Sequence, residues 1–234
     1  MKHAKEPQLT SIELHHIQHE MLTLATRYEA KIFFETGTHL GNTTIAMAKF
    51  KYFDEIHTIE ISDAFIKLSR KAIYEIGAKH FRLDVSNIKL WYGDTAQCMP
   101  GILKNINERC IFWLDAHYDG NVTGKSDLGE CPLVHELNAI KDHPIKDHVI
   151  VIDDIRHSVR DNKEGWPNIS EIIHLIELIN SNYCITIKYG TLFAEVPQSA
   201  FRVDLNEQRV MVYDLDDFEE GFYPWEILAG TTKE

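Results

Sequence analysis

Long apolar runs are absent: the 234 residues include no stretch near the roughly 20 consecutive apolar residues that span a bilayer. The N-terminal segment carries basic side chains without an apolar segment behind them, so we expect neither export nor a membrane anchor. Cysteines are few and form no C-x-x-C pair, which is typical of reduced thiols and favours a cytoplasmic location. The four are Cys98, Cys110, Cys131 and Cys184.

Positive charge is also scarce. The sequence has 24 Lys and Arg against 36 Asp and Glu, a formal net charge of -12, and its basic residues are scattered. Nucleic acids and anionic membranes are polyanions, so this charge disfavours both as partners. With 44% hydrophobic residues the chain can bury one core. We expect one main domain over residues 31–225, after a helical segment at 1–30 and before a tail at 226–234.

Short apolar runs alternate with helix-sized intervals over the first two thirds of the chain. Such alternation is typical of a parallel sheet with helices on both faces. The predicted fold class is therefore α/β, a Rossmann-like three-layer αβα sandwich with a mostly parallel sheet. The strands are expected over 32–34, up to Glu60, and over 88–92, 110–114 and 148–152.

Helices and shorter strands complete the expected fold. Thr10 and Glu13 form a capping box before apolar residues at steps of three and four, which predicts an amphipathic helix ahead of the first strand. A helix is also predicted over 64–76 and another over 169–179. The last segments have short connections, which predicts an antiparallel finish to the sheet over 183–188, 192–196 and 209–213.

An acid closes every predicted parallel strand. The carboxyl ends of parallel strands meet at one edge of a sheet, where ligands bind in folds of this class. Acids are costly to place beside buried apolar strands unless something pairs with them. The sequence therefore predicts a ligand site formed by Glu35, Glu60, Asp94, Asp115, Asp153 and Asp154.

Residues 31–60 have the strand, turn, helix and strand order of a nucleotide-type cofactor site. Gly37 and Gly41 relax the backbone at the turn, so the turn can approach a ligand closely. Glu60 lies about 20 residues further on, where a carboxylate can accept hydrogen bonds from both hydroxyls of a ribose. A generic βα turn with incidental acids is the alternative that these residues leave open.

The glycine spacing and Glu35 indicate the charge of the cofactor. Dinucleotide sites use G-x-G-x-x-G, whereas this turn is G-x-x-x-G and follows Glu35. An acid in that place would repel a pyrophosphate and would suit a cationic ligand. S-adenosylmethionine carries a sulfonium and an ammonium group and therefore fits.

Four motifs resemble those of class I S-adenosylmethionine-dependent methyltransferases: E-T-G-T-H-L-G at 35–41, I-E at 59–60, Y-G-D-T at 92–95 and W-L-D-A-H-Y at 113–118. With V-I-V-I-D-D-I-R at 149–156, the region from about residue 30 to 160 is more closely similar to the macrocin O-methyltransferase group and related sugar O-methyltransferases. The resemblance implies a magnesium ion on Asp115, Asp153 and Asp154. It also implies cofactor contacts at Glu35, Gly37, Thr38, Gly41, Glu60, Asp94 and Asp115.

The implied activity is Mg²⁺-assisted O-methylation of a small-molecule hydroxyl in a sugar or another vicinal diol, with Asp115 and His117 as the catalytic residues. Some members of the group carry an acid, the proposed base, two residues after the first metal-binding aspartate, and this chain has His117 there. An unperturbed histidine, with a pKa of about 6.5, can take a proton at neutral pH. A contact to the substrate is the other role open to His117.

Three other functions account for part of these residues. A metal-dependent hydrolase would use Asp115, Asp153 and Asp154 to activate water, but it leaves Glu35 and Glu60 without a task. A nicotinamide-dependent oxidoreductase fits the fold and not the glycine spacing. A non-catalytic cofactor-binding protein would keep the fold without turnover. Association into a homo-oligomer is also left open.

Segments beside the expected site add further candidates. Residues 119–130 are rich in Gly, Asp and Ser, which predicts either a mobile flap over the acceptor or an ordinary surface connection. Trp166 follows the fifth strand and can either stack on an acceptor ring or join the core. Asp94 can instead form a turn. One acid of the pair at 153–154 can cap the next segment while the other pairs with Arg156.

Overall fold

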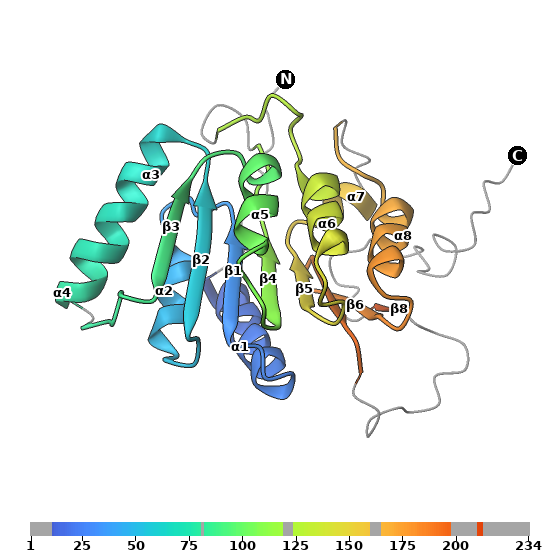
Figure 1. The fold of residues 1–234 in the computed structure, drawn as a ribbon, viewed down its shortest axis with the longest axis horizontal. Coiled ribbons are helices and arrows are strands. Elements are labelled where there is room, and N and C mark those ends of the chain that lie inside the picture. The colour runs from blue at the N-terminus through green and yellow to red at the C-terminus, as the bar shows by residue number, and fades with distance from the viewer. Residues whose placement is uncertain (1–10, 81, 119–123, 160–164, 198–209, 213–234) are drawn as a thin grey trace, which may run out of the picture.

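A computed structural model of the chain describes residues 11–80, 82–118, 124–159, 165–197 and 210–212. In this part of the chain, eight strands form one sheet in the order β3-β2-β1-β4-β5-β7-β6-β8 (Figure 1). The strands are β1 Ile32–Thr36, β2 Glu55–Glu60, β3 Ile88–Tyr92, β4 Cys110–Leu114, β5 Val149–Ile152, β6 Cys184–Lys188, β7 Thr191–Glu195 and β8 Val210–Val212. The helices are α1 Ser11–Arg27, α2 Asn42–Lys49, α3 Asp63–Arg70, the π-helix η1 Lys71–Gly77, α4 Ala78–His80, α5 Thr95–Leu103, α6 Leu133–Asp142, α7 Arg156–Val159 and α8 Ile169–Ile179.

The strand directions confirm the predicted α/β class with a mostly parallel sheet. Strands β1 to β5 pair in parallel, and β7 lies antiparallel between β5 and β6. Tyr189 and Gly190 connect β6 to β7 with φ of 54° and 68°. Two successive residues of positive φ suit a tight two-residue hairpin. The predicted antiparallel finish is thus formed by β7, whereas β8 pairs in parallel with β6.

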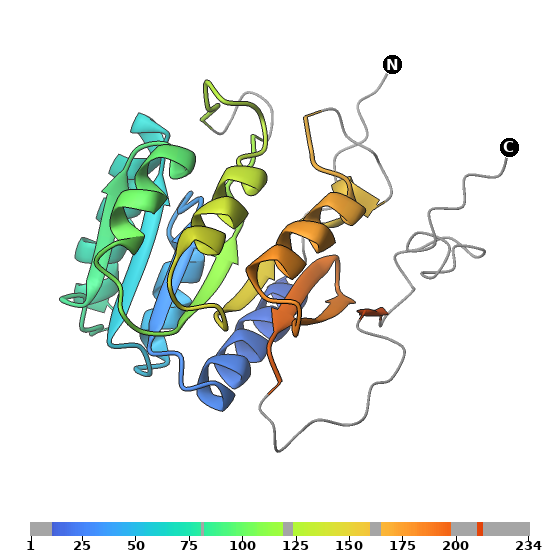
Figure 2. The ribbon, with the colours of Figure 1, turned by 45° about the vertical axis from the view of Figure 1, so that its right-hand side comes forward.

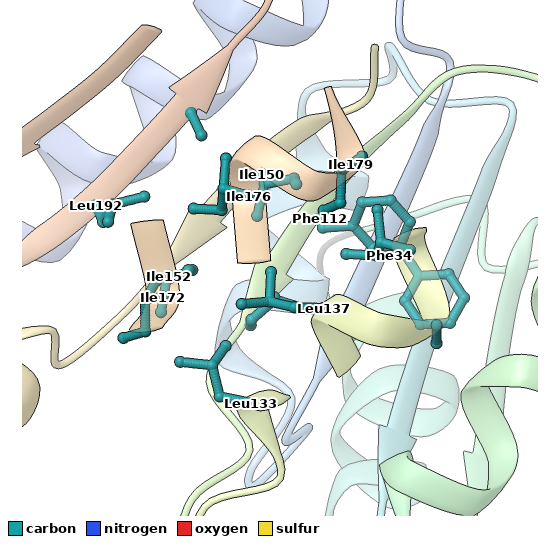
Figure 3. Packing of buried hydrophobic residues seen from close by; sticks show 14 of the residues in the cluster. Phe34, Phe112, Leu133, Leu137, Ile150, Ile152, Ile172, Ile176, Ile179 and Leu192 are labelled. Carbon is teal, nitrogen blue, oxygen red and sulfur yellow. The ribbon is translucent and has the colours of Figure 1, made fainter. Parts of the chain in front are cut away.

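Helices cover both faces of the sheet, which makes three layers (Figure 2). Phe33 packs with α1, α2 and η1 on one face, and its neighbour Phe34 packs with α5, α6 and α8 on the other. Figure 3 shows the second cluster, where side chains of α6 and α8 meet those of β1, β4 and β5. Each fully buried side chain of this kind contributes roughly 1.5–3 kcal/mol to stability.

The amphipathic helix expected before the first strand is α1. Its apolar residues at steps of three and four, such as Ile17, Met21 and Leu24, are buried against the sheet. Two ion pairs connect α1 to the hairpin formed by β6 and β7: Glu20 Oε1 to Lys188 Nζ at 2.9 Å and Arg27 Nη1 to Glu195 Oε2 at 3.4 Å. The predicted cap at Thr10 lies outside the described residues.

The helix predicted over 64–76 starts with α3 and continues through η1 into α4. Ser62 caps it, because its Oγ accepts a hydrogen bond from the backbone N–H of Phe65 at 3.4 Å. The π-helical stretch was not expected, since the apolar period does not encode it. Among the described residues, no helix is both long enough and apolar enough to cross a membrane.

Candidate cofactor and metal site

The sheet changes winding direction between β1 and β4. The chain goes from β1 outward to β2 and β3, and from β4 outward in the opposite direction to β5. In open α/β sheets, ligands bind in the crevice outside the carboxyl ends of the strands at this switch point. The segment that follows β4 and the helix α7 that follows β5 both lie at this end of the sheet, at the top of Figure 1. We call this end the carboxyl edge.

Gly37 joins the two halves of the carboxyl edge. It follows β1 with φ of 82°, and a Cβ at this position would lie 2.5 Å from the backbone oxygen of Asp115, which follows β4. The close approach that the sequence predicted for this glycine is therefore an approach to the protein's own backbone. Any side chain at residue 37 would push the turn after β1 away from the chain leaving β4.

The first two backbone amides of the turn after β1 form hydrogen bonds to β2. The backbone N–H groups of Gly37 and Thr38 both donate to the carbonyl oxygen of Ile59, at 3.0 Å and 3.1 Å. The hydroxyls of Thr38 and Thr58 lie 2.6 Å apart, and both are buried. Gly41 ends the turn with φ of 80° and starts α2. These two amides are therefore already paired and are not available to a pyrophosphate.

Glu35 is fully enclosed, with 1% of its surface exposed. Its Oε2 accepts hydrogen bonds from the hydroxyls of Thr58, at 2.6 Å, and Thr44. Burial raises the pKa of Glu35 to about 7, and the two hydroxyls oppose this shift. The structure thus places this predicted cofactor residue as a link between β1, β2 and α2, beneath the turn.

Glu60 links two turns at the carboxyl edge. Its Oε2 accepts from the backbone N–H of His39, and its Oε1 accepts from that of Ser62, each at 2.7 Å. Burial raises the pKa of Glu60, and these backbone hydrogen bonds oppose the shift. A carboxylate has about four acceptor positions, so capacity remains for a hydroxyl of a ligand.

Asp94 caps α5. Its Oδ1 accepts from the backbone N–H of Ala96 at 3.0 Å. Its Oδ2 accepts from the hydroxyl of Ser126, which belongs to the loop after β4. Both oxygens of this predicted cofactor residue therefore have partners within the protein.

Three side chains converge after β4 and β5 in a geometry that can hold a metal ion. Asp115, His117 and Asp154 each offer one ligand atom, and these atoms lie within 4.8 Å of one another. His117 contacts both acids, with Nδ1 3.5 Å from Asp115 Oδ1 and Nε2 3.2 Å from Asp154 Oδ2. Arg156 Nη2 lies 2.8 Å from the other oxygen of Asp154. The alternative pairing with Arg156 thus coexists with the cluster.

Asp153 lies outside this converging set. Its carboxylate is buried and accepts a hydrogen bond from the hydroxyl of Thr191 on β7 at 3.0 Å. Both acids lie beyond the end of β5, and the backbone at Asp154 is left-handed, with φ of 50°. Of the pair, only Asp154 offers an atom to the converging set. The resemblance implied three carboxylates, whereas the converging groups are two carboxylates and an imidazole. The sequence could not show which acid of the pair turns toward the cluster.

The acids at this edge repel one another. Burial and the neighbouring charges of Asp153 and Asp154 raise the pKa of Asp115 well above its ordinary value. Burial and the charge of Asp154 likewise raise the pKa of Asp153 to about 7. A cation bound among these groups would relieve the repulsion.

Aromatic rings flank the cluster. The Trp166 ring lies 5.1 Å from that of His117 and 4.8 Å from that of His157. Trp166 is partly exposed, whereas His157 is buried. The sequence left two roles open for Trp166, stacking on an acceptor ring or packing in the core. Its partly exposed position beside the cluster is compatible with the first role.

Glu136 is a buried acid at the site that sequence reasoning missed. It lies on α6, among the apolar residues Leu133, Leu137 and Ile140, and has 1% of its surface exposed. Burial raises the pKa of Glu136 to about 7, the hydroxyls of Thr95 and Thr36 oppose the shift, and the charge of Asp94 adds to it. An acid within the apolar face of a helix was the signal that could have found it.

The loop predicted as a flap is described only in part. Residues 119–123 lie outside the described residues. Gly124 packs against the turn after β2, because a Cβ there would lie 2.5 Å from Ile61 Cγ2 and 3.2 Å from the backbone nitrogen of Ser62. The described part of the loop therefore lies over the turns after β2 and β3, on the side of Glu60 and Asp94.

No family model matches this sequence, and no curated protein matches it. The fold is similar to that of solved methyltransferases. An O-methyltransferase from Bacillus cereus in complex with SAH has a TM-score of 0.56 and 17% identity, over 81% of this chain and 83% of that chain. The O-methyltransferase TomG from Streptomyces achromogenes, in complex with SAM, has a TM-score of 0.53 and 16% identity, over 83% of each chain. The SAH-bound methyltransferase PaMTH1 from Podospora anserina has a TM-score of 0.51 and 14% identity, over 83% and 91%.

Proposed function

We propose that this chain is an S-adenosylmethionine-dependent O-methyltransferase that acts on a small-molecule hydroxyl with the help of a divalent metal ion. One observation carries the proposal. The acids suited to a cofactor, Glu60 and Asp94, share the carboxyl edge with the cluster of Asp115, His117 and Asp154, and Gly37 packs against Asp115 where the two halves meet. A methyl donor and a metal-held acceptor must lie side by side, and this edge provides adjacent places for them.

The cofactor assignment is supported by charge and by hydrogen bonding. The turn amides at Gly37 and Thr38 are paired with Ile59, so these two amides are not available to a pyrophosphate. Buried acids on both sides favour a ligand that carries positive charge. The solved Bacillus cereus and TomG proteins contain SAH and SAM within the same fold, which supports this cofactor.

The residues of the cluster fit a divalent ion. Asp115 and Asp154 would hold it through carboxylate oxygens, the ligands that Mg²⁺ prefers. The imidazole of His117 lies between these carboxylates, and we assign it to proton transfer and not to the metal. When bound, the metal would bring two neighbouring hydroxyls together and lower their pKa. We therefore keep the vicinal diol or sugar as the proposed acceptor, in line with the resemblance to macrocin O-methyltransferases.

His117 is the proposed base. Its ring lies between Asp115 and Asp154. In the neutral form it donates its one N–H to one of these acids, which orients the ring, and its other nitrogen keeps the lone pair that takes a proton. An acceptor hydroxyl held beside the ring would give its proton to the imidazole as the methyl group is transferred. The sulfonium is a good leaving group, so alignment of the acceptor with the methyl carbon supplies much of the acceleration.

The proposed function also concerns the extent of the catalytic unit, its partners and its location. The catalytic unit would span residues 31–225, with a small-molecule acceptor and without a nucleic-acid or membrane partner. The four cysteines, all within the described residues, form no disulfide, which fits the proposed cytoplasmic location. Measurement of the mass of the protein in solution tests whether the chain forms a homo-oligomer.

The proposal is tested by calorimetric titration of the purified protein with S-adenosylmethionine, with NADH as control. Each titration is repeated with Mg²⁺ and with EDTA. Binding of S-adenosylmethionine and not NADH is expected in both conditions. Formation of S-adenosylhomocysteine is then measured with catechol and with phenol as acceptors, where the diol should react faster and EDTA should suppress turnover. Absence of S-adenosylmethionine binding overturns the proposed methyltransferase function. Equal turnover in Mg²⁺ and in EDTA overturns the proposed role of the metal ion.

A further inference from the structure

The loop after β4 ends in a small closed hairpin over residues 124–130. Its base is held by a hydrogen bond from the backbone N–H of Tyr118 to the carbonyl oxygen of Glu130, at 2.8 Å. Lys125 Nζ lies 2.9 Å from Glu130 Oε1. Near the tip, Ser126 forms a bridge with Gly129, and the N–H of Leu128 donates to the Ser126 hydroxyl oxygen at 2.9 Å. These contacts give the segment a defined shape of its own.

The hairpin reaches across the carboxyl edge from β4 to the ends of β2 and β3. Gly124 lies against Ile61 and Ser62, so closely that no side chain fits at residue 124. The N–H of the same Ser62 donates to Glu60 Oε1 at 2.7 Å. The hairpin thus covers the place where Glu60 and Asp94 would receive the nucleoside end of the cofactor.

One side-chain contact joins the hairpin to that place. The Ser126 hydroxyl donates to Asp94 Oδ2, while the other oxygen, Oδ1, accepts the cap hydrogen bond from Ala96. A ligand amino group that bonds to Asp94 must share or replace the bond made by Ser126. Asp94 is therefore already engaged by the protein before any ligand binds.

Apart from the packing of Gly124 and the bond from Tyr118 to Glu130, the hairpin buries little of its surface. Every residue from 124 to 130 is at least partly exposed, and the Leu128 side chain at the tip is 53% exposed. The Lys125–Glu130 pair lies within the hairpin and does not connect it to β2 or β3. Segments with few buried apolar contacts open more readily than the core.

We propose that the 124–130 hairpin is a roof over the nucleoside end of the cofactor site and that Ser126 is a positioning residue, which holds the roof shut through Asp94. This inference rests on the proposed function, because it takes S-adenosylmethionine or S-adenosylhomocysteine as the ligand. The cofactor enters when the bond between Ser126 and Asp94 breaks, and the roof closes over it afterwards. Ser126 thereby controls the rates of cofactor entry and exit.

The first test needs no ligand. Hydrogen exchange of the backbone amide of Gly129, whose acceptor is the Ser126 carbonyl oxygen and not its hydroxyl, is compared in the wild type and in Ser126→Ala, Ser126→Thr and Leu128→Ala. Ser126→Ala should exchange several-fold faster, whereas Ser126→Thr keeps a hydroxyl and should resemble the wild type. Leu128→Ala removes an exposed side chain and serves as the matched control. Equal exchange in Ser126→Ala and wild type overturns the role of Ser126, whatever the cofactor.

The second test measures association and dissociation rates of S-adenosylhomocysteine by surface plasmon resonance. Ser126→Ala should raise both rates several-fold, and the dissociation constant should change less than either rate. A merely structural role would instead weaken binding without faster association. If the wild type fails to bind S-adenosylhomocysteine, both the proposed function and the roof are overturned. If it binds and Ser126→Ala has wild-type rates, only the roof is overturned.

Discussion

His117 Nε2 lies 3.2 Å from Asp154 Oδ2, so the histidine that follows β4 meets the acid that follows β5. The two residues are joined because β4 and β5 are parallel neighbours that end at the same edge. This contact places the proposed base and a proposed metal ligand in one cluster.

Replacement of His117 by Asn should lower turnover by about 100-fold or more, the usual effect of losing a general base. The dissociation constant for S-adenosylmethionine should stay within about twofold, because we assign His117 to the acceptor and not to the cofactor. His16→Asn, an exposed histidine on α1, is the control and should be unchanged. Retained turnover in His117→Asn would remove this residue from the proton transfer.

Asp154→Asn and Asp153→Asn should differ in metal binding. Asp154 belongs to the converging cluster, whereas Asp153 bonds to Thr191. Calorimetry with Mn²⁺ should show at least about tenfold weaker binding in Asp154→Asn, as expected for the loss of a direct ligand, and a smaller change in Asp153→Asn. The reverse order would favour the three-acid ligand set implied by the sequence resemblance.

Gly37→Ala should destabilise the protein more than Gly190→Ala. Both glycines have positive φ, at 82° and 68°, which costs an alanine about 1–2 kcal/mol. Only at residue 37 would the added Cβ also meet backbone, 2.5 Å from the oxygen of Asp115, whereas nothing lies within 4 Å of a Cβ at residue 190. Urea unfolding of the two variants separates the cost of the clash from that of φ. Equal losses of stability would show that the turn adjusts freely.

Glu136→Gln should gain stability over the wild type as the pH rises. The pKa of Glu136 is about 7 in the folded protein against an ordinary 4.5, so between these values the folded state binds the proton more tightly than the unfolded state does. The wild type therefore loses stability as pH rises through this window, and the neutral glutamine does not. The difference between the two should grow by about 1.4 kcal/mol per pH unit.

Urea unfolding at pH 5 and at pH 8 measures this difference. Glu177→Gln, which alters an exposed acid on α8, is the control and should show no such trend. A pH-independent difference for Glu136→Gln would mean that the Glu136 carboxylate is stabilised in its charged form.

His148 should make the protein sensitive to acid. Its Nδ1 accepts from the backbone N–H of Cys110 at 2.9 Å, and its Nε2 lies 2.9 Å from His143 Nδ1. Burial lowers the pKa of His148 to about 3 from an ordinary 6.5. As pH falls through this window the unfolded state takes up the proton first, so stability is present above pH 6.5 and is lost toward pH 3.

The matching variant is His148→Gln, which can accept and donate at similar positions but does not titrate. The stability of the wild type should fall relative to that of His148→Gln by about 1.4 kcal/mol per pH unit below pH 6. His174→Asn, on the exposed side of α8, should keep the wild-type slope. Parallel pH curves for wild type and His148→Gln would show that the buried ring accepts a proton without unfolding.

Local sequence patterns predicted much of the fold. The strands expected over 88–92 and 110–114 and the helix expected over 169–179 have the observed bounds of β3, β4 and α8. These elements depend on the spacing of apolar residues and on nearby residues that end a helix or strand, and both are properties of short segments. The π-helix η1 and the parallel direction of β8 were missed, because neither follows from a local period.

By itself, the sequence determined the class of fold and the edge of the sheet at which the acids gather, because an acid closes each apolar strand and parallel strands end together. Only the tertiary structure decided how those acids are used. It turns Asp154 toward His117 and Asp153 toward Thr191, buries Glu136 beside the crevice, and brings Ser126 to Asp94. Each of these contacts joins residues that are distant in the chain or depends on the direction of one side chain, and spacing along a sequence encodes neither.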